Sequence, residues 1–205
     1  MPVTVIDHPL AQHVMTHLRE RTTEPARFRE LCHQLSLLLA LEATKDLATK
    51  AADVETPLER HTGRVLDQGL AIIPILRAGL GMVQPIVDMF PDVSIGYIGL
   101  ERDHQTAVAH SYYCKLPPLE DKRVLIVDPM LATGGTAVQA IGVIFDHGAK
   151  DVALLSIVAA PEGVARVHEK FPHLRIYTAA LDRELNSKKY ILPGLGDFGD
   201  RLYGT

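Results

Sequence analysis

The chain has 205 residues, of which 47% are hydrophobic and 5% aromatic, and it contains no tryptophan. This length predicts a single domain spanning residues 1–205, and the composition predicts a core of Ala, Val, Ile and Leu, which is typical of α/β proteins. The formal net charge of −4 offers no basic field for a phosphate backbone, so nucleic acid is not expected as a partner.

Helical periodicity opens the chain. Segments 8–22 and 24–51 carry apolar residues at three- and four-residue steps, and Pro25 stands where a first helical turn tolerates proline. Residues 55–69 are short and mixed in character, with proline and glycine punctuation, and are compatible with a small hairpin. The chain is therefore expected to begin with a helical segment.

From residue 70 onward, strand-like and helix-like segments alternate. Five compact apolar runs have the length of strands: 70–76, 93–100, 123–128, 152–158 and 174–180. Residues 134–149 and 161–171 lie between such runs and have helical patterns. The alternation predicts right-handed crossovers and a parallel sheet flanked by helices. Ligands of such sheets bind beyond the carboxyl ends of the strands.

The connection at residues 101–122 is long for a link between strands and has no clean helical period. A flexible lid and a projecting hairpin both fit this composition and length. As a lid, the segment would close over a site at the strand ends and keep water out.

The strongest local signal follows the run at 123–128. Asp128 ends that run, and Thr133, Gly134, Gly135 and Thr136 lead into the next helical segment. Glycines let successive N–H groups converge on a phosphate, and a helix start adds partial positive charge. The alternative is an ordinary strand-to-helix turn with Thr136 as a cap, and the residues alone leave both open. The lysine of a P-loop is missing.

Two arginines stand at strand exits. Arg77 leaves the run at 70–76 and is followed by small residues, so that its fork could pair with a multiply charged anion that approaches the backbone. Arg102 follows the run at 93–100 in the same way. The alternative for both is a solvated arginine.

The closing glycines, Gly194, Gly196 and Gly199, have the G-x-G-x-x-G spacing of a dinucleotide-binding loop. That loop needs a following helix and an acidic residue about 20 positions further on, and only six residues follow Gly199. NAD is therefore disfavoured. Two interpretations stay open: a tail packed on the surface, and a backbone loop that folds over a small flat ligand.

Histidines and cysteines give weaker signals. His13 and His17 have the one-turn spacing of two metal ligands, but no third ligand is placed near them, so solvated or packing histidines are favoured. Cys32 and Cys114 match no C-x-x-C spacing, and nothing beside Cys114 supplies a base, so both are expected to be reduced thiols. The absence of an export signal and of an apolar run of about 18 residues favours the cytoplasm over a membrane.

Three motifs, taken together, resemble the uracil phosphoribosyltransferases, a family of type I phosphoribosyltransferases: IPILRAGLGM, VLIVDPMLATGGT and YILPGLGDFGDRLYGT. The similarity extends over nearly the whole chain, including residues 8–10, 27–44 and 158–163. The resemblance implies an α/β fold with a parallel β-sheet flanked by helices, an N-terminal helical segment, a flexible lid or hairpin, and a C-terminal hood. It also implies transfer of the phosphoribosyl group of 5-phospho-α-D-ribose 1-diphosphate (PRPP) to uracil, which yields UMP and pyrophosphate.

The resemblance further implies residue roles. Arg77 matches the arginine of the pyrophosphate loop, and Arg102 matches a second arginine that reaches PRPP. Asp197 lies near both substrates, and together with Asp128 and Arg77 it forms the expected catalytic set. The PRPP loop would comprise Asp128, which lies near the ribose hydroxyls, Pro129, Met130, Leu131, and the 5′-phosphate cradle Ala132, Thr133, Gly134, Gly135 and Thr136. The uracil site would comprise Ile191, Gly196, Asp197 and Phe198.

Family members use Mg²⁺ delivered with the pyrophosphate of the substrate and form homodimers or higher homo-oligomers. Pro129 stands where many relatives in the superfamily carry a second acid, which reduces direct protein ligation of the metal, and Phe198 replaces a small residue and could narrow the base pocket. A phosphoribosyltransferase for another nucleobase and an RNA-binding pyrimidine regulator on the same fold are the alternatives. The C-terminal segment argues against the first, and the net charge argues against the second.

Overall fold

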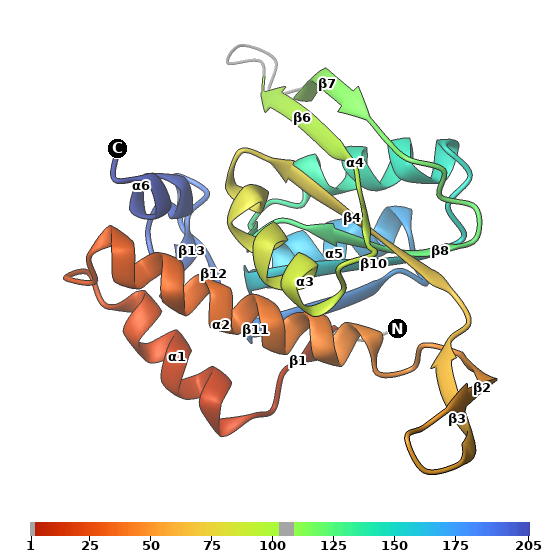
Figure 1. Ribbon diagram of the computed structural model, residues 1–205. Coiled ribbons are helices and arrows are strands. Elements are labelled where there is room, and N and C mark those ends of the chain that lie inside the picture. The colour runs from red at the N-terminus through yellow and green to blue at the C-terminus, as the bar shows by residue number, and fades with distance from the viewer. Residues whose placement is uncertain (1–2, 103–108) are drawn as a thin grey trace.

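A large sheet forms the centre of the computed structural model, which describes residues 3–102 and 109–205, with side chains for 3–100 and 112–205. Its strands are β1 (Thr4–Val5), β4 (Gly69–Leu76), β5 (Ser94–Ile95), β6 (Tyr97–Arg102), β7 (Ala109–Lys115), β8 (Lys122–Val127), β9 (Met130–Leu131), β10 (Asp151–Ala159) and β11 (Arg175–Leu181). The order across the sheet is β1-β11-β10-β8-β4-β6-β7, with β5 beside β4 and β9 beside β10 (Figure 1). All these pairings are parallel except the antiparallel pair β6–β7.

Helices cover both faces of this sheet. One face carries α1 (Pro9–Arg19), α2 (Pro25–Thr44), the 3-10 turn η1 (Ala78–Met82), α3 (Val83–Met89) and α6 (Phe198–Tyr203). The opposite face carries α4 (Gly135–Asp146) and α5 (Pro161–Lys170), as Figure 1 shows. The arrangement is the doubly covered parallel sheet that the alternating pattern predicts, and that prediction is confirmed.

The two cores follow from the two-residue period of a strand. On β8, Leu125 packs into the core beneath α2, whereas Ile126 packs into the core beneath α4. On β4, Ile72 and Ile73 divide in the same way. Successive side chains point to opposite faces, so strands buried on both faces must be apolar at nearly every position.

The predicted strand at residues 93–100 is broken in two. Residues 94–95 form β5 and pair with Ala71 and Ile72 of β4, whereas β6 pairs with β4 further along, at Ile75 and Leu76. Gly96, between them, donates its backbone N–H to the Ile72 carbonyl at 3.0 Å.

The helix predicted at residues 24–51 is longer than α2, which ends at Thr44. Residues 49–55 instead form β2 (Thr49–Glu55), which pairs antiparallel with β3 (Arg60–Leu66). The hairpin expected within 55–69 therefore exists but starts six residues earlier. Pairing seven residues with seven satisfies the backbone groups that the two strands turn toward each other. This stabilisation does not depend on the apolar periodicity from which the helix was predicted.

The interval at residues 101–122 contains a hairpin, because β6 and β7 pair antiparallel from Tyr97–Lys115 to Arg102–Ala109. The prediction also covered residues 103–108, which lie outside the described residues. Closure of this hairpin over the site stays a prediction. In the two described ranges, no helix combines the length and the apolar character that crossing a membrane requires.

Candidate active site

Four chain segments carry the candidate functional residues, and three of them leave the carboxyl edge of the central sheet. Arg77 follows β4, Asp128 follows β8, and Asp182 follows β11. The fourth segment, residues 193–197, follows the small strand β13 (Ile191–Leu192), which pairs with β12 (Glu184–Leu185). Because parallel strands of one sheet end at the same edge, the topology places the first three segments at one edge, and a hydrogen bond from the Gly194 N–H to Asp182 brings the fourth segment to it.

The segment from Asp128 to Gly134 is a firmly held loop. Its second residue is fixed because the Pro129 carbonyl accepts hydrogen bonds from two N–H groups of β10, both at 3.0 Å. The Asp128 carbonyl also accepts the Ser156 hydroxyl at 2.7 Å, and the Asp128 side chain is half-buried. These hydrogen bonds hold the start of the loop against β10.

Gly134 turns the chain into α4. Its φ of 75° lies in the left-handed region, and a Cβ at this position would lie 2.7 Å from the Gly163 carbonyl oxygen. A side chain would therefore suffer both backbone strain and a clash with the start of α5. The N–H groups at the beginning of the twelve-residue helix α4 face outward from this turn without a side-chain cap, which is the arrangement that binds phosphate groups.

The pyrophosphate-loop candidate packs directly on the loop just described. Arg77 precedes η1 and its side chain is exposed, whereas Gly79 is buried against the carbonyl oxygen of Val127, the residue before Asp128. Any Cβ at position 79 would overlap that oxygen, so only glycine permits the two loops to touch. The Leu76–Arg77 peptide bond is cis.

The candidate base loop, residues 193–197, is held to α1 and to the end of β11 by a largely buried ion pair that the sequence prediction missed. Asp182 accepts a hydrogen bond from the Gly194 N–H at 2.8 Å, and Arg19 of α1 donates to the Gly194 carbonyl at 2.7 Å. Arg19 and Asp182 also bind each other through two contacts of 2.5 and 2.8 Å. Asp182 stands at a strand exit, as Arg77 and Asp128 do, and that position is the signal that could have found it.

A short helix follows the base loop, contrary to the expectation that no helix has room there. Asp197 is exposed and caps α6, with Oδ1 accepting the Asp200 N–H at 3.0 Å. Arg201 donates to the carbonyls of Leu18, Glu20 and Leu195 at 2.6 to 2.8 Å, and these bonds fasten α6 to the end of α1. One polar capping residue and one arginine stabilise a helix too brief to show periodicity in the sequence.

The side chains of Ile191 and Phe198 point into the core. Their side chains are 4% and 2% exposed and belong to the core beneath α2, where the Phe198 ring meets Phe28 edge-on at 5.0 Å. The Phe198 ring fills the core, and a narrower base pocket stays a prediction. Both residues have only backbone groups left for a ligand, as does Gly196, which is exposed with a φ of 84°.

The base segment and the pyrophosphate loop are in contact. Leu202 packs on Gly81 of η1, and the Tyr203 hydroxyl donates to the Arg77 carbonyl oxygen at 3.2 Å. Together with the contact between Gly79 and Val127, these contacts join the Arg77 loop to the start of the 128–136 loop and to the C-terminal segment. Arg102 is the last residue of β6, and its side chain lies outside the described residues.

The histidine and cysteine interpretations can be placed as well. The His13 and His17 rings meet edge-on at 4.7 Å, and within residues 3–102 and 109–205 no three His, Cys, Asp or Glu side chains gather as a metal-binding group. Cys32 is buried, and desolvation raises the pKa of its thiol to about 12, which leaves it protonated and unreactive. Cys114 is exposed on β7.

A mostly parallel sheet covered by helices on both faces, with the candidate residues at its carboxyl edge, is the fold of the type I phosphoribosyltransferases. A hypoxanthine phosphoribosyltransferase from Staphylococcus aureus shares this fold with a TM-score of 0.55 at 14% identity, covering 84% of this chain and 82% of that one.

More specific comparisons give the family. The model of the uracil phosphoribosyltransferase family matches residues 5–205. A uracil phosphoribosyltransferase from Thermosipho africanus is 49% identical over 207 residues and covers 100% of both chains. The structure of the AQ2163 protein from Aquifex aeolicus is 37% identical with a TM-score of 0.94, covering 100% of this chain and 99% of that one. The chain belongs to the uracil phosphoribosyltransferase family.

Proposed function

We propose that this protein transfers the phosphoribosyl group of PRPP to uracil and releases UMP and pyrophosphate. The observation that carries the proposal is that the Arg77 loop contacts both the end of β8, where the 128–136 loop begins, and the C-terminal segment. The Arg77 loop touches the end of β8 through Gly79, and it touches the hood through Tyr203. Family membership over residues 5–205 supports the same activity.

In this reaction the bond from the anomeric carbon to the pyrophosphate oxygen breaks, and pyrophosphate leaves with the electron pair. A bond forms from the anomeric carbon to N1 of uracil, which loses its proton. Because the leaving group is highly charged, bond breaking is expected to run ahead of attack, with an oxocarbenium-like transition state as in glycoside chemistry. Arg77 would bind the departing pyrophosphate, while the loop from Asp128 to Thr136 would hold the ribose 5-phosphate in place.

The base loop is suited to a flat base with alternating acceptors and donors. Gly194 and Gly196 have φ values of 60° and 84°, so the loop turns at two positions that carry no side chain. Backbone N–H and C=O groups would match the edge of uracil, and cytosine would place its amino group against a donor, leaving unpaired groups. We infer that residues 191–198 contribute mainly backbone groups to base recognition.

We also propose that Mg²⁺ enters with the pyrophosphate of PRPP. Magnesium is commonly held by one or two carboxylates, water and substrate phosphates, and Asp128 and Asp197 are the carboxylates at this edge that fit such a role. When bound, the ion would neutralise charge on the leaving group. The half-buried Asp128 is held by its loop and would orient the ribose hydroxyls.

The test of the activity is to incubate the protein with Mg²⁺, PRPP and each of uracil, cytosine, hypoxanthine, guanine, adenine and orotate, and to follow nucleotide formation. UMP formation with no product from the other bases is expected. Formation of a different nucleotide without UMP would overturn the uracil assignment. The same mixture with EDTA in place of Mg²⁺ is expected to lose activity.

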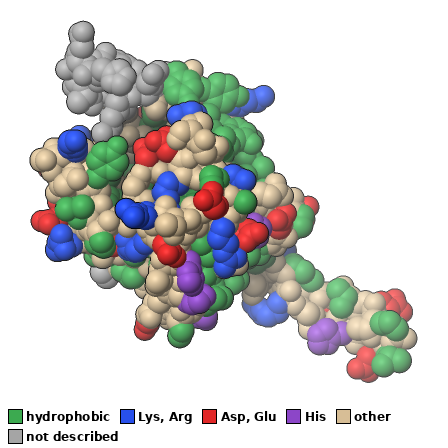
Figure 2. Space-filling model, turned by 90° about the vertical axis from the view of Figure 1, so that its left-hand side faces the viewer, with side chains coloured by type: hydrophobic (Ala, Val, Ile, Leu, Met, Phe, Trp, Pro, Cys, Tyr) green, Lys and Arg blue, Asp and Glu red, His purple; other side chains and the backbone are tan. Residues whose placement is uncertain are grey.

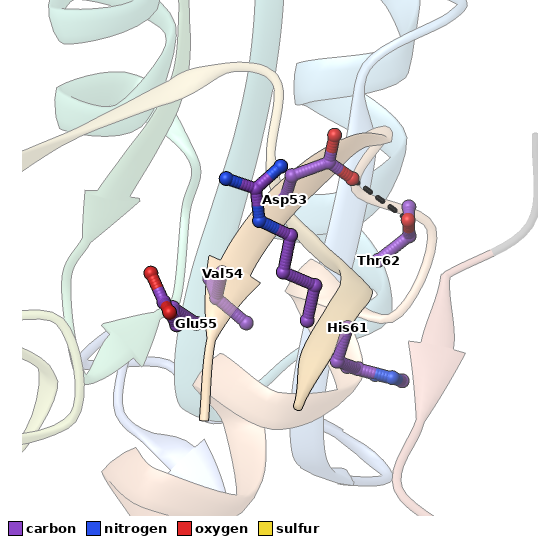
Figure 3. A pocket seen from close by; sticks show the side chains of 6 residues that line it. Asp53, Val54, Glu55, His61 and Thr62 are labelled. Carbon is purple, nitrogen blue, oxygen red and sulfur yellow. Dashed lines mark hydrogen bonds between the residues drawn. The ribbon is translucent and has the colours of Figure 1, made fainter. Parts of the chain in front are cut away.

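We propose, finally, that the protein forms a homo-oligomer through the β2–β3 hairpin. The hairpin stands away from the rest of the molecule (Figures 1 and 2), and nearly all of its side chains are exposed, including Val54, Leu58, Val65 and Leu66. Figure 3 shows a pocket lined by side chains of both strands, among which the Thr62 hydroxyl donates to Asp53 at 2.7 Å. An isolated two-stranded hairpin is marginal in water, so a second copy of this chain is the expected partner for its apolar side chains.

Light scattering coupled to gel filtration tests this assembly. The unmodified protein is expected to run as a dimer or larger species, and Leu58→Asp at the hairpin tip, where the side chain is 94% exposed, is expected to shift it toward monomer. Leu41→Asp, at an exposed position of α2, is the matched control. A monomeric unmodified protein, or equal masses for both variants, would contradict the proposal.

A further inference from the structure

Helix α6 lies between the two candidate substrate sites. Its first end is capped by Asp197, directly after the base loop, and its last residue, Tyr203, reaches the pyrophosphate loop. Six helical residues span about 9 Å, so one rigid turn and a half separates the two ends. A displacement of the base loop would therefore be transmitted to the other end with little loss.

The contact at the far end is specific. The Arg77 carbonyl accepts two hydrogen bonds, one from the Leu80 N–H at 3.1 Å within its own turn and one from the Tyr203 hydroxyl at 3.2 Å. Partial burial raises the pKa of the Tyr203 hydroxyl, which therefore stays protonated as a donor near neutral pH. The second bond fixes the backbone of the residue whose side chain is expected to meet pyrophosphate.

Packing reinforces that hydrogen bond. The Leu202 side chain is 3% exposed and lies so close to Gly81 that a Cβ at position 81 would be 2.8 Å from Leu202 Cδ2. Arg29 of α2 donates to the Leu202 carbonyl at 2.9 Å, and the Cys32 thiol donates to the Gly81 carbonyl at 3.5 Å. The last turn of α6 and η1 thus rest on the same stretch of α2.

The near end of α6 is fixed just as firmly. Arg201 binds the Leu195 carbonyl within the base loop at 2.8 Å, and its guanidinium lies 4.6 Å from the centre of the Phe28 ring. The base loop, α6 and the pyrophosphate loop therefore form a continuous series of contacts, and at its far end the Tyr203 hydroxyl makes the hydrogen bond to the Arg77 carbonyl.

We propose that Tyr203 is a positioning residue that couples the base site to the PRPP site, by holding the Arg77 carbonyl from the end of the helix that the base loop begins. The inference rests on the proposed function. Occupancy of either site would favour the arrangement in which this hydrogen bond is made, so that each substrate tightens the other. By linkage, the factor by which PRPP raises the affinity for uracil must equal the factor by which uracil raises the affinity for PRPP.

The test is Tyr203→Phe, which removes the hydroxyl and keeps the ring. The variant is expected to raise the KM for PRPP and the KM for uracil, each measured at a saturating concentration of the other substrate, by a similar factor of about three- to tenfold, the effect of one hydrogen bond. In calorimetric titrations of uracil against Mg²⁺ and pyrophosphate, a pair that fills the base site and the Arg77 side of the PRPP site and cannot react, the coupling factor is expected to fall toward one in both orders of addition.

Thr205→Val is the matched control, because it removes the hydroxyl that donates to Asp200 at 3.3 Å in the same terminal turn and leaves Arg77 untouched. It is expected to retain the unmodified coupling factor. Equal coupling in the Tyr203→Phe variant and the unmodified protein, while both form UMP, would overturn the inference and leave the activity standing. Failure of the unmodified protein to form UMP would instead refute the proposed function.

Discussion

Arg19 and Asp182, 163 positions apart in the chain, form a two-point ion pair in which the carboxylate is 5% exposed and the guanidinium 24%. The same carboxylate receives the Gly194 N–H, and the same guanidinium donates to the Gly194 carbonyl. One ion pair thus fixes both backbone polar groups of a single residue in the base loop. It links the first helix of the chain, the end of β11 and the hood.

Asp182→Asn is expected to lower the free energy of unfolding by about 3 kcal/mol, because it leaves the Arg19 charge partly buried without its counterion. It should also raise the KM for uracil more than the KM for PRPP. The control is Arg183→Gln, which breaks the exposed neighbouring pair with Glu184 and should cost less than about 0.5 kcal/mol. Urea unfolding and steady-state kinetics measure both effects, and equal stabilities of the two variants would contradict the role of Asp182.

Gly134→Ala is expected to damage the phosphate cradle. The left-handed φ and the 2.7 Å approach to the Gly163 carbonyl predict a cost of about 1–3 kcal/mol and a KM for PRPP raised at least about tenfold. Gly142→Ala in the same helix α4 meets nothing within 4 Å and should stabilise the protein by about 0.5–1 kcal/mol. If the two alanine variants behave alike in thermal unfolding and kinetics, the cradle does not need its glycine.

Asp197→Asn separates the charge of the residue from its capping role. Asparagine caps helices as well as aspartate does, so stability should change by less than about 0.5 kcal/mol while turnover falls about a hundredfold. Asp197→Ala should lose the cap to the Asp200 N–H as well, at a further cost of about 1 kcal/mol. Asp200→Asn, a charge change on the same helix, serves as the control in initial-rate assays. Near-normal turnover in Asp197→Asn would remove this carboxylate from the reaction.

At the opposite edge of the sheet, the side-chain hydrogen bond from Arg123 to Asp46, at 2.7 Å, holds the pKa of that carboxyl below its usual value. The unfolded chain then binds the proton more readily, so this contribution to stability is present above the unfolded pKa of about 3.9 and is lost as pH falls through the lower folded pKa.

Asp46→Asn should therefore lower the free energy of unfolding at pH 7 by only about 1 kcal/mol, since the Asp46 side chain is 59% exposed. The difference from the unmodified protein should shrink below about pH 4. Urea titrations at pH 7, 5 and 3 give the comparison, with Glu30→Gln, whose partner Arg27 is exposed, as the control. A difference that stays constant with pH would mean that the ionised carboxylate is not what stabilises the fold.

Much of the fold was predictable because strands that are buried on both faces appear in the sequence as continuous apolar runs. The runs at 70–76, 123–128, 152–158 and 174–180 correspond to β4, β8, β10 and β11 within one or two residues. Elements with little core of their own escaped prediction: β2, β12, β13 and α6 are exposed or very short. Their residues are held by pairing or capping, which leaves no periodic apolar signal.

The candidate site was likewise predictable only in part. Arg77 and Asp128 stand next to strand runs, so their place at the carboxyl edge followed from the alternation of strands and helices, and the closing glycines were recognisable as a backbone loop. Which atoms of that loop face the crevice did not follow. Phe198 and Ile191 turned out to fill the core, and only contacts with α2 decide that.

The sequence by itself determined the parallel α/β architecture, the phosphate-cradle motif and the family resemblance, because these depend on local pattern and on the spacing of residues along the chain. The tertiary structure alone decided that Arg19 and Asp182 hold the base loop, that Gly79 seats one loop on another, and that Tyr203 meets Arg77. Those contacts join residues up to 175 positions apart, and their partners are fixed by how helices and strands pack rather than by any signal in the neighbouring residues.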